Sequence, residues 1–200
     1  LGRQELYAEV LDDTEGALWS YSMIEQNRIN QDELPELRRI VVAVDPAVTN
    51  NEQSDETGIV VAGVDATERY YVIDDVSDRM GADTWARAAV DCYFRYNADR
   101  IVAEVNNGGD LVESVIRTID GSVPYTAVRA SRGKIVRAEP IAALYEQKRV
   151  HHVGLFKDLE DQLCSYTGHQ SSKSPDRLDA LVWALTELSS NSGQAFWRIS

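Results

Sequence analysis

The sequence predicts an α/β fold in which a central mixed sheet with a leading antiparallel hairpin carries helices on both faces. Three observations lead to this prediction. Short apolar runs rich in β-branched residues mark the strands, and the first of them is Ile40 to Val44. Residues 58–76 contain two such runs on either side of a polar turn, which is typical of a hairpin. From residue 81 onward, helical segments alternate with further short strands, as in sheets that helices cover on both sides.

Each predicted element has a local signature in the sequence. The runs at 40–45 and 100–105 are apolar on both faces, which places these strands in the interior of the sheet. The segment 108–120 repeats apolar residues at helical spacing, with Leu111, Val115 and Ile119 on one face. In chain order, the prediction is a strand at 40–45, a hairpin at 58–76, a helix at 81–97, a strand at 100–105, a helix at 108–120, a strand at 125–130, a helix at 134–148, a strand at 149–154 and helices at 157–166 and 175–190.

The composition restricts the classes of function. A chain of 200 residues that is 44% apolar is long enough for one globular domain, and no apolar run has the length of a membrane span. Cys92 and Cys164 form no closely spaced pair, which favours a reducing, cytosolic compartment with both thiols buried. The net charge of −13 argues against a free-standing DNA-binding protein. Residues 129–149, however, hold six basic and two acidic residues, a strip that could guide a DNA backbone or form a solvated helix face.

Acidic residues stand where predicted strands end and where the last helix begins. Asp45 and Glu104 each lie at the end of a buried strand, and Asp179 lies in the first turns of the final helix with Asp176 one turn before it. Because buried acids are costly without partners and hard cations prefer oxygen ligands, the set suggests a site for divalent metal ions that hydrolyse a phosphodiester. Taken singly, Asp45 could start a turn, Glu104 could pair with an arginine and Asp176 could stabilise a helix N-terminus.

Other catalytic motifs are absent or incomplete in the sequence. The segment ASRGKI is no phosphate-binding loop, because Val128 and Ile135 replace its first glycine and its Ser or Thr. His151 and His152 are neighbours on a predicted strand, so their rings point to opposite faces and cannot easily share one metal. No GxSxG elbow and no Gly-rich dinucleotide fingerprint is present. These absences leave the carboxylates as the best candidates for a site.

Several motifs together resemble one family, the C-terminal nuclease domain of the large terminase subunit of tailed bacteriophages. They are VVAVDPA, DETGIVVAG, IVAEVNNGGD, ASRGKIVRAEPIAALYEQKRVHHVG and SPDRLDALVWAL, and the resemblance covers nearly the whole chain. It implies a ribonuclease H-like nuclease domain at 36–200, and a lead-in at 1–35 from an ATPase domain that precedes it in a longer chain. It also implies a metal-dependent endonuclease that cuts concatemeric double-stranded viral DNA during genome packaging, with two Mg²⁺ or Mn²⁺ ions.

The resemblance also implies which acids form the site. Asp45, Glu104 and Asp179 match the catalytic and metal-binding acids of the family. Asp176 and Asp55 match positions near the metals and are further candidate ligands. Other members of the family can carry Asp at the middle position, so the longer Glu104 is expected to shift that ligand slightly.

Basic positions and partners follow from the same resemblance. Arg132, Lys134 and Arg137 match a basic motif that is expected to contact DNA phosphates. The implied partners are double-stranded DNA, the ATPase domain, the portal protein and the small terminase subunit, with no membrane, in the host bacterial cytoplasm at the procapsid. Two alternatives stay open: another ribonuclease H-like enzyme, such as a resolvase or transposase, and a catalytically degenerate docking module of the packaging motor.

Overall fold

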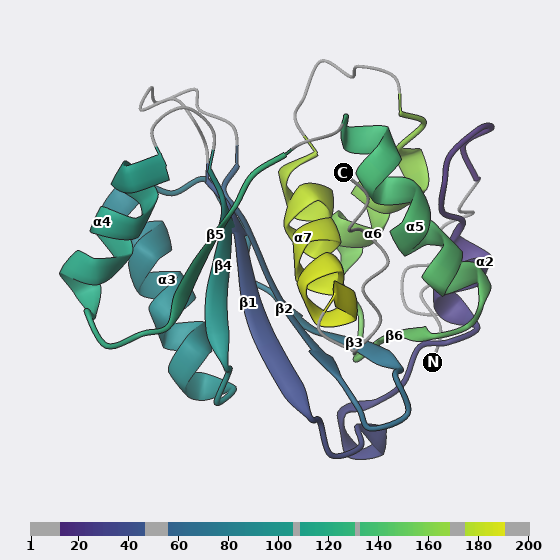
Figure 1. The fold of residues 1–200 in the computed structure, drawn as a ribbon. Helices are drawn as coiled ribbons and strands as arrows, with labels where there is room; N and C mark the ends of the chain where they lie inside the picture. The colour runs from purple at the N-terminus through teal and green to yellow at the C-terminus, as the bar shows by residue number, and fades with distance from the viewer. Residues whose placement is uncertain (1–12, 47–55, 106–108, 131–132, 169–174, 191–200) are drawn as a thin grey trace, which may run out of the picture.

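A six-stranded mixed sheet forms the centre of the protein in the computed structural model, which describes residues 13–46, 56–105, 109–130, 133–168 and 175–190. Its strands are β1 (Arg39–Asp45), β2 (Gly58–Val64), β3 (Tyr70–Asp75), β4 (Arg100–Glu104), β5 (Tyr125–Val128) and β6 (Val150–His152). They lie in the order β5-β4-β1-β2-β3-β6 (Figure 1). The β1–β2 and β2–β3 pairs are antiparallel, whereas β1–β4, β4–β5 and β3–β6 are parallel. The sheet is therefore mixed, and its hairpin comes first, as predicted.

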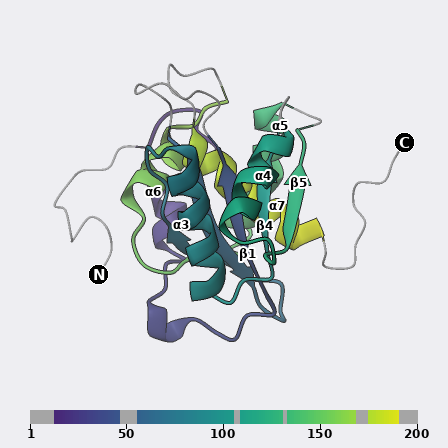
Figure 2. The ribbon, with the colours of Figure 1, turned by 90° about the vertical axis from the view of Figure 1, so that its left-hand side faces the viewer.

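Helices cover both faces of the sheet. They are α2 (Tyr21–Glu25), α3 (Ala82–Arg95), α4 (Gly109–Ile119), α5 (Lys134–Glu146), α6 (Lys157–Ser165) and α7 (Asp176–Ser190), with a short 3-10 helix η1 (Gln31–Glu33). Figures 1 and 2 show α3 and α4 on one face and α7, α5, α6 and α2 on the other. The predicted fold class, α/β with a central mixed sheet between two helical layers, is confirmed.

The predicted elements from residue 40 onward agree with the structure to within two residues at each end. The hairpin turns because the Asp65 carboxylate accepts hydrogen bonds from the backbone N–H groups of Thr67 and Arg69. In the predicted helix at 108–120, Ile116 is fully buried, whereas Leu111 lies in the first turn of α4 and is 67% exposed. Within the described ranges, no helix is both long and apolar enough to cross a bilayer.

Side chains alternate along β1 and divide the core into two halves. Val41 and Ala43 belong to the core beneath α7, whereas Val42 and Val44 belong to the core beneath α3. The α7 helix lies across β1 and β2, and its apolar stripe is buried there as predicted, with Leu178, Leu181, Val182, Leu185 and Leu188. Because residues two apart share a face, Asp45 points to the α7 side of the sheet.

Residues 13–35, the described part of the predicted lead-in, contact both cores: the segment through Ile24 packs on the α7 side, whereas Ile29 and Leu34 pack against the core beneath α3. Trp19 and Ile24 are buried in the core beneath α7. Ile29 forms a parallel bridge with Val153, just beyond β6. The lead-in thus contributes to the core of the domain, and the ATPase domain expected before it stays a prediction.

Candidate active site

Two strand-end acids lie side by side at the edge of the sheet where β1 and β4 end. These strands are parallel neighbours in which Val44 pairs with Ala103, so the next residues, Asp45 and Glu104, stand level. Both lie on the face that α7 covers, since Ala43 and Val102 two residues earlier belong to the core beneath that helix. The register of one parallel strand pair therefore brings together two of the predicted acids.

The first turns of α7 bring two further acids to the same edge. Asp176 and Asp179 are buried there, one helical turn apart. The helix approaches β2 so closely that a Cβ atom on Gly58 would lie 2.0 Å from the carbonyl oxygen of Asp176. Gly58 is paired with Asp45 across the β1–β2 ladder. A glycine at this position thus allows α7 to place its acids beside the end of β1.

Asp176 is more enclosed than its place near the helix start suggests. A carboxylate in the first turn of a helix, as the sequence places Asp176, is expected to be easier to solvate than Asp179, but Asp176 is only 6% exposed. The physical reason is the close contact between its backbone and Gly58, which presses the first turn of α7 onto the sheet. Asp176 is therefore a member of the buried acid cluster, which we define as Asp45, Glu104, Asp176 and Asp179; Asp45 is half-buried at the strand end, and the other three are buried.

The buried acid cluster concentrates negative charge in a region from which water is largely excluded. Burial raises the pKa of Asp45 well above its ordinary value, and repulsion from Asp179, Glu104 and Asp176 raises this pKa further. Burial also raises the pKa of Asp179, an effect that Lys134 offsets only in part. A cluster of this kind is stabilised by a bound cation, because the cation restores the charged form of the acids.

Two basic residues from the first turns of α5 reach this cluster. The Lys134 Nζ donates a hydrogen bond to Oδ2 of Asp179, and the lysine side chain is 45% exposed. Arg137 is turned inward, with its side chain only 13% exposed and its Nη1 3.6 Å from Oε2 of Glu104. For these two residues the interpretation as a solvated helix face is wrong, because both side chains point toward the acids.

The donor set of the cluster fits hard divalent cations, since it consists of carboxylate oxygens from three separate elements. Among the described residues, no three Asp, Glu, His or Cys side chains already stand as a closed set of metal ligands. Protein groups also hold two of these carboxylates: Lys134 donates to Asp179, and the indole of Trp183 donates to Glu104. The predicted residues Asp55 and Arg132 lie outside the described residues.

Sequence reasoning assigned no role to Trp183, Gly58 or Arg177. Trp183 follows Asp179 by four residues on α7 and could have been noticed from that spacing. The Arg177 guanidinium binds Glu56 and Asp75 and ties the start of α7 to β3 and to the segment before β2. The roles of Gly58 and Arg177 depend on contacts between segments far apart in the chain, which no local pattern reveals.

The predicted histidine geometry is confirmed. His152 is buried, with its ring between Tyr145 and Glu160, while the His151 ring stacks on Tyr71 on the other side of β6. The two cysteines, Cys92 and Cys164, are buried, as predicted. Cys92 and Cys164 belong to the two cores of the domain, and neither the cysteines nor the histidines are members of the acid cluster.

Residues 42–188 match the family model of the terminase RNaseH-like domain. The chain belongs to this family. The match includes all four members of the buried acid cluster and extends through the last buried leucine of α7, Leu188. A comparison with curated proteins gave no match.

Solved structures of terminase nucleases share this fold at low sequence identity. The nuclease domain of the large terminase subunit gp2 of bacterial virus Sf6 has a TM-score of 0.63 at 13% identity, over 84% of this chain and 98% of that one. A human cytomegalovirus terminase nuclease domain, soaked with Mn and inhibitor-bound, has a TM-score of 0.60 at 14% identity, over 86% and 95%. The large terminase of a thermophilic bacteriophage has a TM-score of 0.64 at 12% identity, over 90% of this chain but only 47% of that one. The fold is thus ribonuclease H-like, and the chain spans about half of the thermophilic phage protein.

Proposed function

We propose that this domain is a metal-dependent endonuclease that cuts concatemeric double-stranded viral DNA during genome packaging, by two-metal phosphodiester hydrolysis. The observation that carries the proposal is the buried acid cluster, in which the pKa values of Asp45 and Asp179 are raised at the edge of a terminase RNaseH-like fold. A purely structural role would leave this concentration of buried charge without compensation.

Asp45, Glu104 and Asp179 are the proposed ligands of two Mg²⁺ or Mn²⁺ ions, with Asp176 and Asp55 as additional ligands. Bound there, such ions would activate a water molecule and stabilise the leaving oxygen of the phosphodiester. The parallel register of β1 and β4 fixes the spacing between Asp45 and Glu104, and α7 presents Asp179 to both. The chain thus preorganises oxygen ligands on rigid elements, so little rearrangement is needed when the ions bind.

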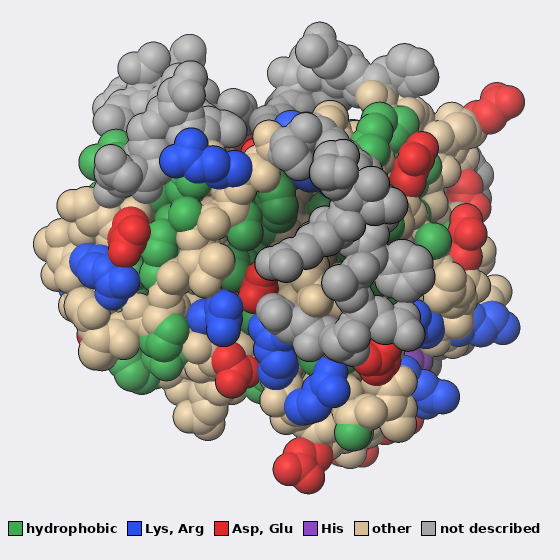
Figure 3. Space-filling view, viewed as in Figure 1, with side chains coloured by type: hydrophobic (Ala, Val, Ile, Leu, Met, Phe, Trp, Pro, Cys, Tyr) green, Lys and Arg blue, Asp and Glu red, His purple; other side chains and the backbone are tan. Residues whose placement is uncertain are grey.

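Of the three basic residues predicted to contact DNA, Lys134 has the exposure that such a contact needs; Arg137 is turned inward toward Glu104, and Arg132 stays a proposal. Lys134 is half-exposed beside Asp179, so its ammonium group can meet a phosphate next to the ligands. In the view of Figure 3, the described Lys and Arg side chains are interspersed with Asp and Glu rather than gathered into one basic surface. With a net charge of −13 as well, the isolated domain is expected to bind DNA weakly and to lose activity steeply with salt.

Three facts about similar proteins support the proposed metal and partners. The cytomegalovirus domain was soaked with Mn, and a variant of the Sf6 domain was solved with manganese. The large terminase of the thermophilic bacteriophage was solved in complex with ADP. We therefore propose an ATPase domain in the same full-length chain, and the portal protein and small terminase subunit as further partners, in the host bacterial cytoplasm at the procapsid.

A plasmid-nicking assay tests the proposal. The domain is expected to nick supercoiled DNA with Mg²⁺ or Mn²⁺ and to be inactive in EDTA. Asp45→Asn is expected to be inactive in both, whereas Asp91→Asn, which neutralises an exposed acid on α3, is expected to retain activity. Cleavage that persists in EDTA would contradict a metal mechanism, and a folded domain that never cuts DNA would favour the docking module.

A further inference from the structure

Glu104 differs from the other members of the buried acid cluster in its length. A glutamate has one more rotatable bond than an aspartate, so its carboxylate must be fixed before it can serve as a well-placed ligand. In the structure, Trp183 Nε1 donates a hydrogen bond of 2.7 Å to Oε2 of Glu104, and both residues are buried. Among the described residues, Trp183 is the hydrogen-bond donor to this carboxylate, and Oε1 accepts no such bond.

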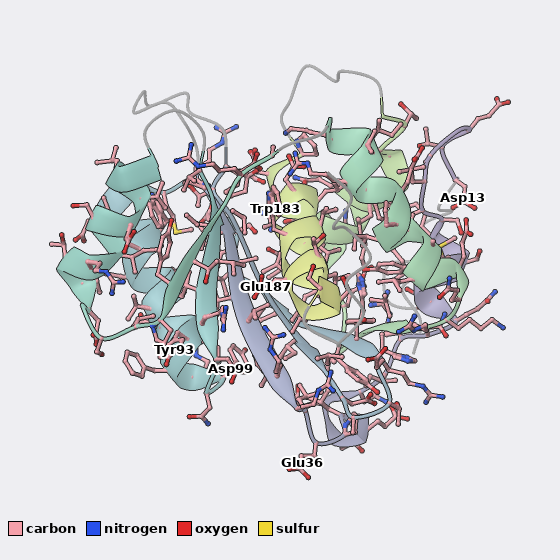
Figure 4. All side chains as sticks on the ribbon, viewed as in Figure 1. Asp13, Glu36, Tyr93, Asp99, Trp183 and Glu187 are labelled. Carbon is pink, nitrogen blue, oxygen red and sulfur yellow. The ribbon has the colours of Figure 1, made fainter. Side chains whose placement is uncertain are left out.

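Trp183 reaches Glu104 from the same helix that carries the aspartates. It lies one turn beyond Asp179 on α7, on the side of the helix that faces β4 (Figure 4). The guanidinium carbon of Arg137 lies 4.5 Å from the centre of the indole ring, a cation–π contact. The Nη1 atom of Arg137 is 3.6 Å from the same Oε2 that the indole contacts. The indole is therefore held between the arginine and the carboxylate.

The hydrogen bonding of Arg137 points to the same arrangement. Its Nε and Nη1 atoms are buried and make no hydrogen bond within the described part of the chain. Arg137 therefore contributes its charge and its flat contact with Trp183, while the directional bond to Glu104 comes from the indole. A buried arginine stacked in this way restricts the rotation of the tryptophan ring.

We propose that Trp183 is a positioning residue for the metal site: it fixes Oε2 of Glu104 and leaves Oε1 to bind a divalent ion. The inference rests on the proposed function, because it assigns Glu104 as a metal ligand. A hydrogen bond that orients a ligand before the metal arrives reduces the cost of ordering that ligand on binding. Trp183 thus adapts the site to the longer Glu104.

Trp183→Phe separates this role from simple packing, since it keeps an aromatic ring beside Arg137 and removes the N–H donor. Trp19→Phe is the matched control, because Trp19 is also buried in the core beneath α7 and its Nε1 has no hydrogen-bond partner among the described residues. Glu104→Asp is the background for a double-mutant comparison. Its shorter carboxylate is withdrawn from the indole, so Trp183 should have little left to position.

Calorimetric titration with Mn²⁺ gives the first readout. Trp183→Phe is expected to weaken Mn²⁺ binding about 10-fold or more, as loss of a group that orients a ligand commonly does, while Trp19→Phe binds like wild type. In the Glu104→Asp background, adding Trp183→Phe is expected to change the affinity less than about 2-fold, because the bond is already lost. Wild-type affinity in Trp183→Phe, or an equal loss in both backgrounds, would overturn the inference.

Nuclear magnetic resonance of the wild-type indole groups gives a second readout that needs no folded variant. On titration with Mg²⁺, the Nε1–H signal of Trp183 is expected to shift with the midpoint of metal binding, while that of Trp19 stays in place. A Trp183 signal that does not respond although Mg²⁺ binds would overturn the positioning role alone. A wild-type protein that binds neither Mn²⁺ nor Mg²⁺ would overturn the proposed function and this inference with it.

Discussion

The carboxyl pKa values are shifted in opposite directions at two places in this domain: at Glu160 and in the buried acid cluster. Glu160 on α6 is fully buried and accepts hydrogen bonds from Arg28, from Nδ1 of His152 and from the backbone of Phe156. Burial alone would raise the pKa of Glu160, but the bonds from His152 and Arg28 outweigh it and lower the pKa to about 2. In the buried acid cluster, by contrast, the pKa values of Asp45 and Asp179 are raised.

The difference shows how to tell a structural acid from a functional one. The Glu160 group is complete: its charge is neutralised by Arg28, and it ties the predicted lead-in to α6 and β6. The acid cluster has more negative charge than Lys134 and Arg137 compensate, so it lowers the stability of the metal-free domain. A buried acid whose pKa is lowered supports the fold, and one whose pKa is raised is a candidate for binding a cation.

The largest expected effect comes from removing a charge from the acid cluster. Asp45→Asn is expected to reduce DNA cleavage roughly a thousand-fold, because a metal ion contributes several kcal/mol to stabilising the transition state. The same change should raise the melting temperature of the metal-free domain, since it relieves repulsion from Asp179, Glu104 and Asp176. Cleavage rates and thermal melts with and without Mn²⁺ measure both effects.

The two acids of α7 sharpen this prediction. Asp179→Asn is expected to behave like Asp45→Asn, whereas Asp176→Asn should reduce cleavage only in part. Full activity of Asp179→Asn, or an inactive Asp176→Asn beside it, would reverse these two roles. If Asp45→Asn instead melts at a lower temperature than wild type without metal, the acid cluster stabilises the domain as Glu160 does, and the contrast between the two would be wrong.

Neutralising Glu160 should have the opposite effect on stability. Glu160→Gln leaves Arg28 buried without its main counter-charge, which is expected to cost about 3 kcal/mol of unfolding free energy. Glu113→Gln is the control, because it breaks only an exposed pair with Arg117 and should change stability by less than about 1 kcal/mol. Urea unfolding measures both variants, and equal stability of the two would mean that the Glu160 group is not structural.

Lys134 contacts Asp179 and is half-exposed to solvent. Its removal should strengthen the binding of metal ions and weaken the binding of DNA. Lys134→Gln removes a cation beside Asp179, so Mn²⁺ is expected to bind a few-fold more tightly in the absence of DNA. Affinity for double-stranded DNA should fall a few-fold, since one phosphate contact is lost. Lys148→Gln, at an exposed site beyond the far end of α5, is the control. Unchanged affinities for both ligands would place Lys134 outside the site.

The Glu160 carboxylate also predicts a dependence of stability on pH. The folded-state pKa of Glu160 is about 2 against an ordinary 4.5, so the stability it contributes is fully present above about pH 5 and is lost as the pH falls toward 2. The stability difference between wild type and Glu160→Gln should therefore shrink steadily between pH 5 and pH 3 in urea unfolding. A difference that stays constant over this range would show that Glu160 is not held in its charged form.

Local patterns predicted the elements and the strand-end acids, because strands and helices follow from periodicity and because Asp45 and Glu104 directly end their runs. Partners across the fold were not predictable. The Trp183–Glu104 bond, the Arg28–Glu160 pair and the contact of Gly58 with α7 each join segments more than seventy residues apart. The enclosure of Asp176 was missed for the same reason. Long-range contacts decide whether a buried acid has hydrogen-bond partners and a counter-charge. The sequence therefore located the acids but could not show whether the pKa of each one is raised or lowered.

The central claim is that Asp45, Glu104 and Asp179 together bind divalent metal ions. Crystals soaked with Mn²⁺ and measured for anomalous scattering test it most directly, because the signal locates the ions without reference to activity. The account predicts anomalous peaks bounded by these three carboxylates, with Lys134 displaced from Asp179. Mn²⁺ bound only elsewhere, or no peak at these carboxylates in crystals of a protein that cuts DNA with Mn²⁺, would contradict it.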